Sequence, residues 1–195
     1  MASRIRNCTN GWIALGRIRP SNWLIFGYDV PDEPSRVKVR LWRQLKSLGA
    51  LYPQMSFCIL PDSRQTRADL ERLAAATKQY GPNVILQAKA AGKQNFSSLL
   101  SLFRDELRSE YLELAEECNE FLDEIKSNIA SGNITPEEVS ELEAALDGLK
   151  RWHEKIQRKD FVGTDDGSGI DRLFNKCSKA LLRFSARAER HKVKP

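Results

Sequence analysis

The spacing of apolar residues changes once along this 195-residue chain, near residue 90, and this change constrains the fold more than any other feature. Before it, short segments with apolar residues at every second position are separated by segments with a spacing of three to four. After it, every apolar stripe has the helical spacing. Strands alternating with helices, followed by helices alone, predict an α+β domain and then a helical subdomain.

The first half contains three segments with strand character, at residues 22–30, 55–60 and 83–88, and a short strand partner is expected near residues 51–52. A first helix is expected over residues 36–48, with Ser35 as its N-cap and Gly49 as its C-terminal stop. A second helix follows Asp62 or Ser63 and continues to Tyr80. This order predicts a ferredoxin-like βαββαβ domain over residues 21–90, after an N-terminal extension at residues 1–20 that shows no clear period.

The strand at residues 22–30 is apolar on both of its faces. Leu24 and Phe26 point to one face, and Trp23 and Ile25 point to the other. Ferredoxin topology supplies helices for only one face of the sheet, so the face around Trp23 and Ile25 needs another cover. There are two alternatives for this cover. One is a second copy of the chain, which would make a homodimer through the open sheet face, and the other is the chain's own helical subdomain.

The second half predicts an antiparallel three-helix subdomain over residues 96–192, after a small-residue linker at residues 90–95. The first of its helices runs from Phe96 and is broken at residues 131–133. The second begins after Thr135, where Pro136 and Glu138 complete a capping-box pattern. A flexible loop is expected at residues 163–169, before a last helix from about Ile170.

Charge is distributed unevenly, although the net charge is only +5. Residues 1–103 carry a net +9, residues 104–147 a net −11, and residues 148–195 a net +7. One interpretation is that the basic and acidic segments pair within the chain or lie on solvated faces. The other is that the remaining basic surface meets a polyanion such as DNA.

Cysteine usage and hydropathy point to a cytoplasmic protein without a membrane segment. Cys8, Cys58, Cys118 and Cys177 form no CxxC pair, which favours buried free thiols in a reducing compartment. His153 and His191 have no partner at a metal-ligand spacing. No Ser/His/Asp or Cys/His arrangement indicates nucleophilic catalysis, so we expect neither an enzyme nor a cofactor.

The first helix carries the candidate nucleic-acid-binding residues. At 100° per residue, its apolar stripe is centred on Leu41 and Leu45. Four cations lie on the opposite side of a helical wheel and predict contacts with phosphates: Arg36, Arg40, Arg43 and Lys46. The alternatives are a solvated face and pairing with the acidic helix at residues 105–124. Trp42 lies at the boundary, where it can pack or support a cation–π contact.

Two further sets of residues are weaker candidates. Asp29 ends the first strand and is either a turn residue, bonded to a backbone N–H of residues 32–35, or a ligand of a divalent metal. Four arginines of the helical subdomain are expected to pair between helices with partners such as Glu110 and Asp160. The alternative for this set is an oxyanion pocket: Arg104, Arg108, Arg151 and Arg158.

Three stretches together resemble a known family: "WLIFGYDVPDEPSRVKVRLWRQLKSLGALYPQMSFCILP", "FRDELRSEYLEL" and "RWHEKIQRKDF". They resemble the N-terminal domain of ChrB, the chromate-resistance regulator, over about residues 22–190. No counterpart of ChrB's C-terminal chromate-resistance domain is expected in this sequence. The matching residues in the first stretch are Trp42, Arg43, Leu45, Lys46, Leu48, Gly49, Leu60 and Pro61. In the other two stretches they are Phe103, Arg108, Glu110, Tyr111, Arg151, Trp152, Ile156, Arg158, Asp160 and Phe161.

The first domain is also similar, more distantly, to the C-terminal half of PaaX-type repressors and to the small CRISPR-associated ferredoxin-like subunit. These resemblances imply a homodimer built on the sheet and DNA binding in transcriptional regulation, in resistance to chromate or another oxyanion. The CRISPR-associated subunit keeps a metal-linked Asp at the end of its first strand, which implies a metal-dependent nuclease using Asp29 as the alternative. A protein–protein interaction module without nucleic acid is the third hypothesis.

Overall fold

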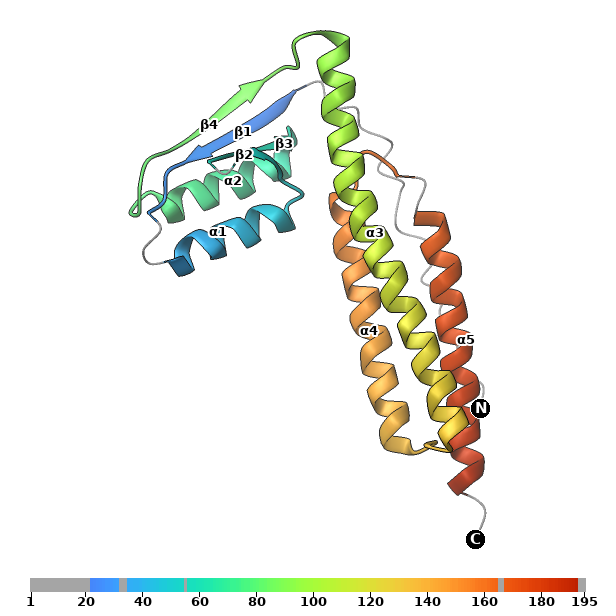
Figure 1. The fold of residues 1–195 in the computed structure, drawn as a ribbon. Coiled ribbons are helices and arrows are strands. Elements are labelled where there is room, and N and C mark those ends of the chain that lie inside the picture. Colours follow the sequence, from blue (N-terminus) through green and yellow to red (C-terminus); the bar gives the residue numbers. More distant parts are fainter. Residues whose placement is uncertain (1–21, 32–34, 55, 165–166, 193–195) are drawn as a thin grey trace, which may run out of the picture. The chain divides into compact units, whose positions relative to one another are not determined.

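The computed structural model describes residues 22–31, 35–54, 56–164 and 167–192 of the chain (Figure 1). The chain divides into two compact units. Unit 1 comprises the residues up to Leu100 together with Phe161–Gly163, and unit 2 comprises Ser101–Asp160 together with the residues from Thr164 onward. The predicted α+β class is confirmed, and the predicted N-terminal extension at residues 1–20 lies outside the described residues.

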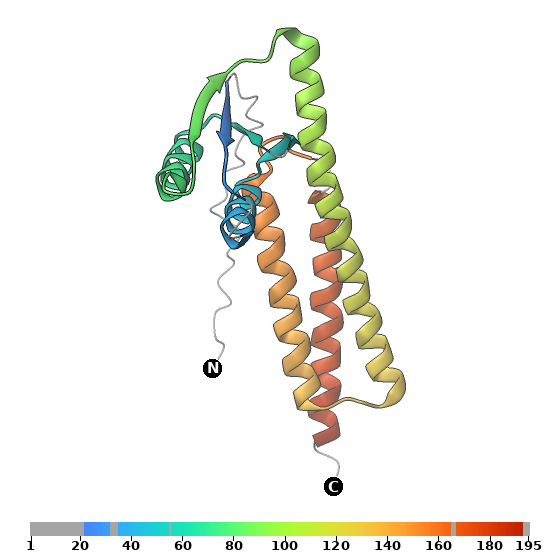
Figure 2. The same ribbon diagram turned by 60° about the vertical axis from the view of Figure 1, so that its left-hand side comes forward.

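Unit 1 contains a four-stranded sheet in the order β2-β3-β1-β4, and all neighbouring strands are antiparallel. Helices α1 and α2 lie on the same face of this sheet (Figures 1 and 2). The elements in chain order are β1 (Trp23–Tyr28), α1 (Ser35–Ser47), β2 (Leu51–Gln54), β3 (Phe57–Pro61), α2 (Arg64–Thr77) and β4 (Asn83–Ala88).

The core of unit 1 lies between the sheet and its two helices. Leu24 and Phe26 of β1 meet Leu41 and Leu45 of α1, and all four side chains are at most 2% exposed. Burial of each such side chain contributes roughly 1.5 to 3 kcal/mol before the cost of conformational entropy. Gly49 ends α1 with a φ of 81°, as the sequence predicts.

Helix α2 begins as predicted but ends three residues early. The Ser63 hydroxyl accepts a hydrogen bond from the Thr66 backbone N–H at 3.0 Å, which confirms Ser63 as the N-cap. The helix ends at Thr77 and not at Tyr80, and the Tyr80 N–H bonds to the Thr77 carbonyl at 2.9 Å in a turn. Asn83 donates to the Ala74 carbonyl at 2.9 Å, which also accepts from the Lys78 backbone N–H at 3.0 Å, and this second bond ties the start of β4 to the helix end.

The second face of the sheet is covered at one end only. Trp23 is 2% exposed, and its ring lies 6.4 Å from that of Phe96 and 6.0 Å from that of Phe161, both in unit 1. Farther along the same face, Val84 is 49% exposed and Leu86 is 52% exposed. Phe96 and Phe161 therefore cover the face around Trp23, and the end of the face at Val84 and Leu86 is about half exposed among the described residues of unit 1.

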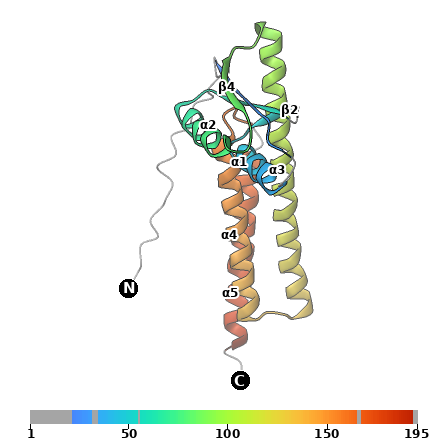
Figure 3. The same ribbon diagram turned by 90° about the vertical axis from the view of Figure 1, so that its left-hand side faces the viewer.

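Three long helices follow, and within unit 2 they lie side by side and antiparallel (Figures 1, 2 and 3). They are α3 (Gly92–Ser131), α4 (Pro136–Lys159) and α5 (Gly167–Lys192). The predicted linker at residues 90–95 is shorter than expected because α3 already begins at Gly92. Lys93 and Gln94 are good helix formers, and this propensity outweighs the small neighbouring residues. Helix α5 likewise begins at Gly167, before the predicted start at Ile170.

Thr135 caps α4 as predicted, and its hydroxyl accepts from the Glu138 backbone N–H at 3.2 Å. The Glu138 carboxylate does not complete a capping box, because it accepts hydrogen bonds from Asn128 and Asn133 at 2.7 Å each. These two bonds fasten the end of α3 and the turn onto the start of α4.

None of the described helices is long and apolar enough to cross a bilayer. The thiols of Cys58, Cys118 and Cys177 are free and buried, as predicted.

Candidate functional site

The four predicted phosphate-binding cations lie around the exposed side of α1, but they do not form a single row. Arg36 and Arg40 line the groove between α1 and α2. Lys46 lies on the other flank of the helix, with its Nζ atom 5.6 Å from the centre of the Tyr52 ring. Arg43 is exposed between the two flanks. The separation follows from helical geometry, because residues 40 and 46 differ by about 120° around the axis.

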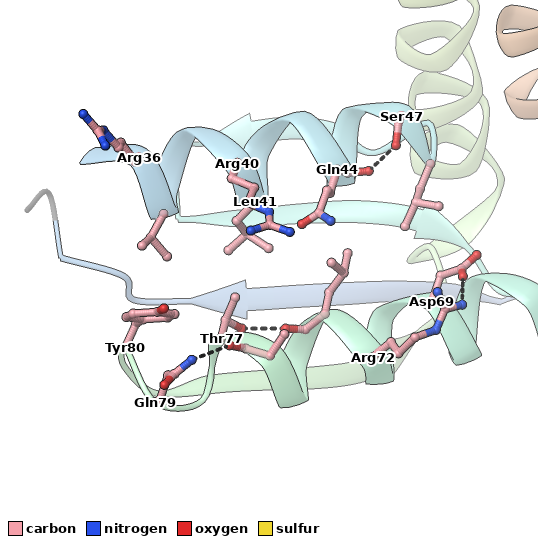
Figure 4. A pocket seen from close by; sticks show the side chains of 14 residues that line it. Arg36, Arg40, Leu41, Gln44, Ser47, Asp69, Arg72, Thr77, Gln79 and Tyr80 are labelled. Atoms are coloured by element: carbon pink, nitrogen blue, oxygen red, sulfur yellow. Dashed lines mark hydrogen bonds and ion pairs between the residues drawn. The ribbon is translucent and has the colours of Figure 1, made fainter. Parts of the chain in front are cut away.

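The groove between α1 and α2 encloses about 600 Å³. Figure 4 shows that Arg40 and Gln44 point into it from α1, whereas the Arg36 guanidinium points away from the groove. Arg72 approaches from α2, and its guanidinium is paired with the Asp69 carboxylate (Figure 4). The groove floor is apolar and includes Val37, Leu41, Leu48, Leu73 and Ala76. The Arg40 guanidinium above this apolar floor suits an anion held at the rim.

Three arginines of α1, Arg36, Arg40 and Arg43, differ from the arginines of α2 in their surroundings. All three side chains are exposed, and none forms an ion pair or a hydrogen bond with another described residue of the unit. Arg67 contrasts with them, because it forms two hydrogen bonds with the Asp62 carboxylate, at 2.5 and 2.6 Å. With respect to the described residues of unit 1, the α1 guanidinium groups are therefore open to an external anion, whereas Arg67 and Arg72 are already engaged.

The polar groups beneath α1 are neutral at physiological pH. The Tyr28 hydroxyl donates to the Tyr52 hydroxyl at 3.5 Å. Burial raises the pKa of Tyr28 and Tyr52, and the hydrogen bond with Tyr28 raises the pKa of Tyr52 further. Burial also raises the pKa of the Cys58 thiol to about 12. Cys58 is therefore a protonated core residue and not a thiolate nucleophile.

Asp29 lies just beyond the end of β1 with its side chain exposed. Its backbone N–H donates to the Pro82 carbonyl at 2.9 Å, which ties the end of β1 to the turn before β4. Among the described residues, no group of three or more His, Cys, Asp or Glu side chains is placed to hold a metal ion. The predicted hydrogen-bond partners of the Asp29 carboxylate at residues 32–34 lie outside the described part of the chain.

The four candidate oxyanion residues of unit 2 are all exposed. Arg158 pairs with Glu154 of its own helix at 3.7 Å, where an interhelical partner was expected. Arg104, Arg108 and Arg151 form no ion pair with any described residue of unit 2. Two of the four arginines lie on α3 and two on α4, and a shared oxyanion site stays a prediction.

An interhelical ion pair that the sequence did not reveal joins Lys159 of α4 to Glu110 of α3 at 2.6 Å. Beside it, the Asp160 carboxylate accepts from the Tyr111 hydroxyl at 3.3 Å and from the Thr164 hydroxyl at 2.8 Å. Burial and the Asp160 charge raise the pKa of Tyr111. The helix motifs at residues 103–111 and 151–161 thus meet in one polar cluster, which holds unit 2 together.

His153 is a core residue of unit 2 and is 8% exposed. Its ring stacks on Phe174 at 5.2 Å and meets the edge of Tyr111 at 6.2 Å. Burial lowers the pKa of His153, and its Nε2 atom has no hydrogen-bond partner among the described residues. These contacts favour a neutral packing residue.

Comparison with known proteins gives one match. The sequence model of the family described as "Protein ChrB, N-terminal" matches residues 36–194, a range that begins at the second residue of α1 and extends past the end of α5. No curated protein and no solved structure matches the chain.

Proposed function

We propose that this chain, which belongs to the ChrB N-terminal family, is a non-enzymatic DNA-binding module of transcriptional regulation. The family resemblance associates that regulation with resistance to chromate or a related oxyanion.

We also assign unit 1 to the ferredoxin-like fold. The strand–helix–strand–strand–helix–strand sequence of elements and the strand order β2-β3-β1-β4 support this assignment.

The observation that carries the DNA-binding proposal is the exposure of three arginines on α1. Arg36, Arg40 and Arg43 are exposed and have no ion-pair partner among the described residues of unit 1, on a helix whose opposite face is fixed in the core by Leu41 and Leu45. Such cations bind phosphates without reading sequence, and they release counterions from DNA when they do so. The proposal therefore concerns affinity for the backbone, with strong dependence on salt.

We expect the triple variant Arg36→Gln, Arg40→Gln, Arg43→Gln to flatten the salt dependence of duplex binding. Each phosphate contact contributes about −0.9 to the slope of log affinity against log salt, so three lost contacts reduce its magnitude by about 3. Fluorescence anisotropy of a labelled random duplex, titrated at several salt concentrations, measures this slope. Incubation of the parent protein with the same duplex and Mg²⁺ or Mn²⁺ should leave the duplex intact. This experiment tests the nuclease alternative that would use Asp29.

The matched control replaces three exposed arginines of α5, Arg183, Arg187 and Arg190, by glutamine. This variant loses the same number of positive charges but keeps every side chain of α1. Its salt slope should stay close to that of the parent protein. Equal slopes for the α1 variant and the parent, at equal circular dichroism, would reject the proposal. Metal-dependent cleavage that disappears in Asp29→Asn would support the nuclease alternative instead.

We further propose that the chain forms a homodimer through the open end of the sheet face. Val84 and Leu86 are each about half exposed on β4, and they lie beside Ile25 of β1 on the same face. An apolar patch on a sheet face is a frequent site of protein–protein contact, and a stable interface buries about 1,600 Å² in total. The twofold operation would bring two copies of β4 and β1 together.

We expect Leu86→Asp to convert a micromolar dimer into a monomer, because a carboxylate at the centre of the interface loses its hydration. Analytical ultracentrifugation measures the change. Leu182→Asp is the matched control, since Leu182 is 72% exposed on α5 and lies outside the proposed interface. A parent protein that sediments as a monomer at micromolar concentration would contradict the dimer.

A further inference from the structure

A second groove of unit 1 lies on the other flank of α1, between this helix and β2. It encloses about 470 Å³, which is within the usual range for a site that holds a small organic group. Unlike the groove between α1 and α2, it is largely aromatic. Its main lining residues are Tyr28, Val39, Trp42, Tyr52, Pro53 and Gln54.

Trp42 offers an open ring at this groove. It is 46% exposed, and its indole makes no ring contact with another described aromatic residue. Tyr28 is 8% exposed and donates a hydrogen bond to Tyr52 at 3.5 Å, so the two phenol rings are held in place behind it. A large exposed aromatic side chain beside fixed rings is unfavourable in water and favourable against a flat apolar ligand.

Cations flank the same rings. Lys38, Trp42 and Lys46 are spaced by four residues, so they follow one another along one side of α1 with a rise of about 6 Å per step. Lys38 lines the groove, and the Lys46 ammonium lies 5.6 Å from the centre of the Tyr52 ring. Arg43 is exposed next to this row. The ligand that matches both properties is planar and aromatic and also carries negative charge.

Gln54 adds a hydrogen-bonding group at the margin of the groove, since its amide can both donate and accept. A paired base in a duplex shows its edge in a groove but hides its faces within the stack, so it cannot lie against Trp42. An unpaired base can stack there while its phosphates meet the lysines. A proline-rich peptide also fits aromatic grooves, but it makes no use of the flanking cations.

We infer that the groove between α1 and β2 binds an unpaired nucleotide of single-stranded or locally opened nucleic acid, with its base against Trp42. The inference rests on the proposed phosphate binding by α1. It extends that proposal because it requires an unpaired strand, which binding to a duplex does not require. It also assigns separate roles to the two flanks of α1. Arg36 and Arg40 contact the phosphate backbone of any nucleic acid, and the flank with Trp42 binds the unpaired base.

The test compares binding of a labelled thymine oligonucleotide of about 12 nucleotides with binding of a labelled duplex, using the full chain. Trp42→Ala should weaken oligonucleotide binding about 10-fold, the effect of losing one stacked base, and leave duplex binding unchanged. Trp42→Phe should restore most of the loss because a ring remains. Tyr80→Ala is the matched control: Tyr80 is 40% exposed in unit 1 but lines the groove between α1 and α2.

The outcomes separate this inference from the proposed function. If Trp42→Ala binds the oligonucleotide as tightly as the parent does, the groove inference is overturned while salt-dependent duplex binding still stands. If neither nucleic acid binds the parent, both are overturned. If a proline-rich peptide binds in a Trp42-dependent manner and the oligonucleotide does not bind, the groove is a peptide site and the inference fails. Circular dichroism of each variant confirms that the fold is kept.

Discussion

Gly81→Ala is expected to lower the free energy of unfolding of unit 1 by about 3 kcal/mol, at the upper end of the usual cost of overpacking. A Cβ atom at this position would lie 1.8 Å from the carbonyl oxygen of Asp29 and 3.0 Å from its carbonyl carbon. The obstacle is backbone, so no side-chain rotation relieves it. The Asp29 N–H is bonded to Pro82 at 2.9 Å and Tyr28 is paired with Asn83, which fixes the end of β1 against this turn.

Hydrogen exchange measured by mass spectrometry resolves the effect, because it reports on peptides of the two units separately. Faster exchange in β1 and β4, with little change in the middle of α4 and α5, is the expected result. Gly148→Ala is the contrasting control: its Cβ would meet only Arg151 Nη2, at 3.9 Å, within helix α4. That variant should stabilise unit 2 by about 0.5 to 1 kcal/mol. A Gly81→Ala protein with unchanged exchange in β1 would contradict the steric account.

The elements of the fold were predictable from the sequence because their signals are local. The Ser63 and Thr135 caps act within three residues, and Gly49 ends α1 through its own backbone conformation. Helix α3 begins earlier than predicted, at Gly92, because Lys93 and Gln94 are good helix formers. The early start of α5 at Gly167 has no such local signal, because Ser168 and Gly169 are poor helix formers. The close approach of Gly81 to Asp29 could not be foreseen, because it depends on how the end of β1 meets the turn before β4.

The candidate site was predictable in its residues but not in its arrangement. A helical wheel places Arg36, Arg40 and Lys46 on the side away from the core, but it does not show which neighbouring element each one faces. The structure puts Arg40 toward α2 and Lys46 toward β2, and this divides the predicted surface into two flanks with different chemistry. The aromatic groove was missed because Tyr28, Trp42 and Tyr52 come from three separate elements. An exposed Trp at the edge of a basic helix was the signal that could have found it.

Long-range pairing in unit 2 was likewise hidden from the sequence. The partners Glu110 and Lys159 are 49 residues apart, and many other Glu and Lys side chains share their helices. Only the packing of α3 against α4 selects this pair. Cations at nearby positions of the same motif, such as Arg158, meet partners within their own helix or none among the described residues.

Lys159→Met is expected to lower the free energy of unfolding of unit 2 by about 2 kcal/mol. The value lies between the small contribution of exposed ion pairs and the larger cost of breaking a fully buried one. The Lys159 and Glu110 side chains are 14% and 25% exposed, and their charged atoms lie 2.6 Å apart. Removal of the ammonium leaves the Glu110 carboxylate partly desolvated without its partner. Chemical denaturation measures the loss of free energy of unfolding, and hydrogen exchange of the α3 and α4 peptides locates it in unit 2.

Arg158→Met is the control that isolates the ion pair. Arg158 and Lys159 are both cations in the last turn of α4, so each interacts with the same helix dipole. Arg158, however, pairs at 3.7 Å with Glu154, and the two side chains are 66% and 58% exposed, so its loss should cost less than about 0.5 kcal/mol. The difference between the two variants therefore measures the contact with Glu110. The charge swap Glu110→Lys with Lys159→Glu should recover part of the loss, whereas equal destabilisation by Arg158→Met and Lys159→Met would show that the pair contributes nothing beyond the helix terminus.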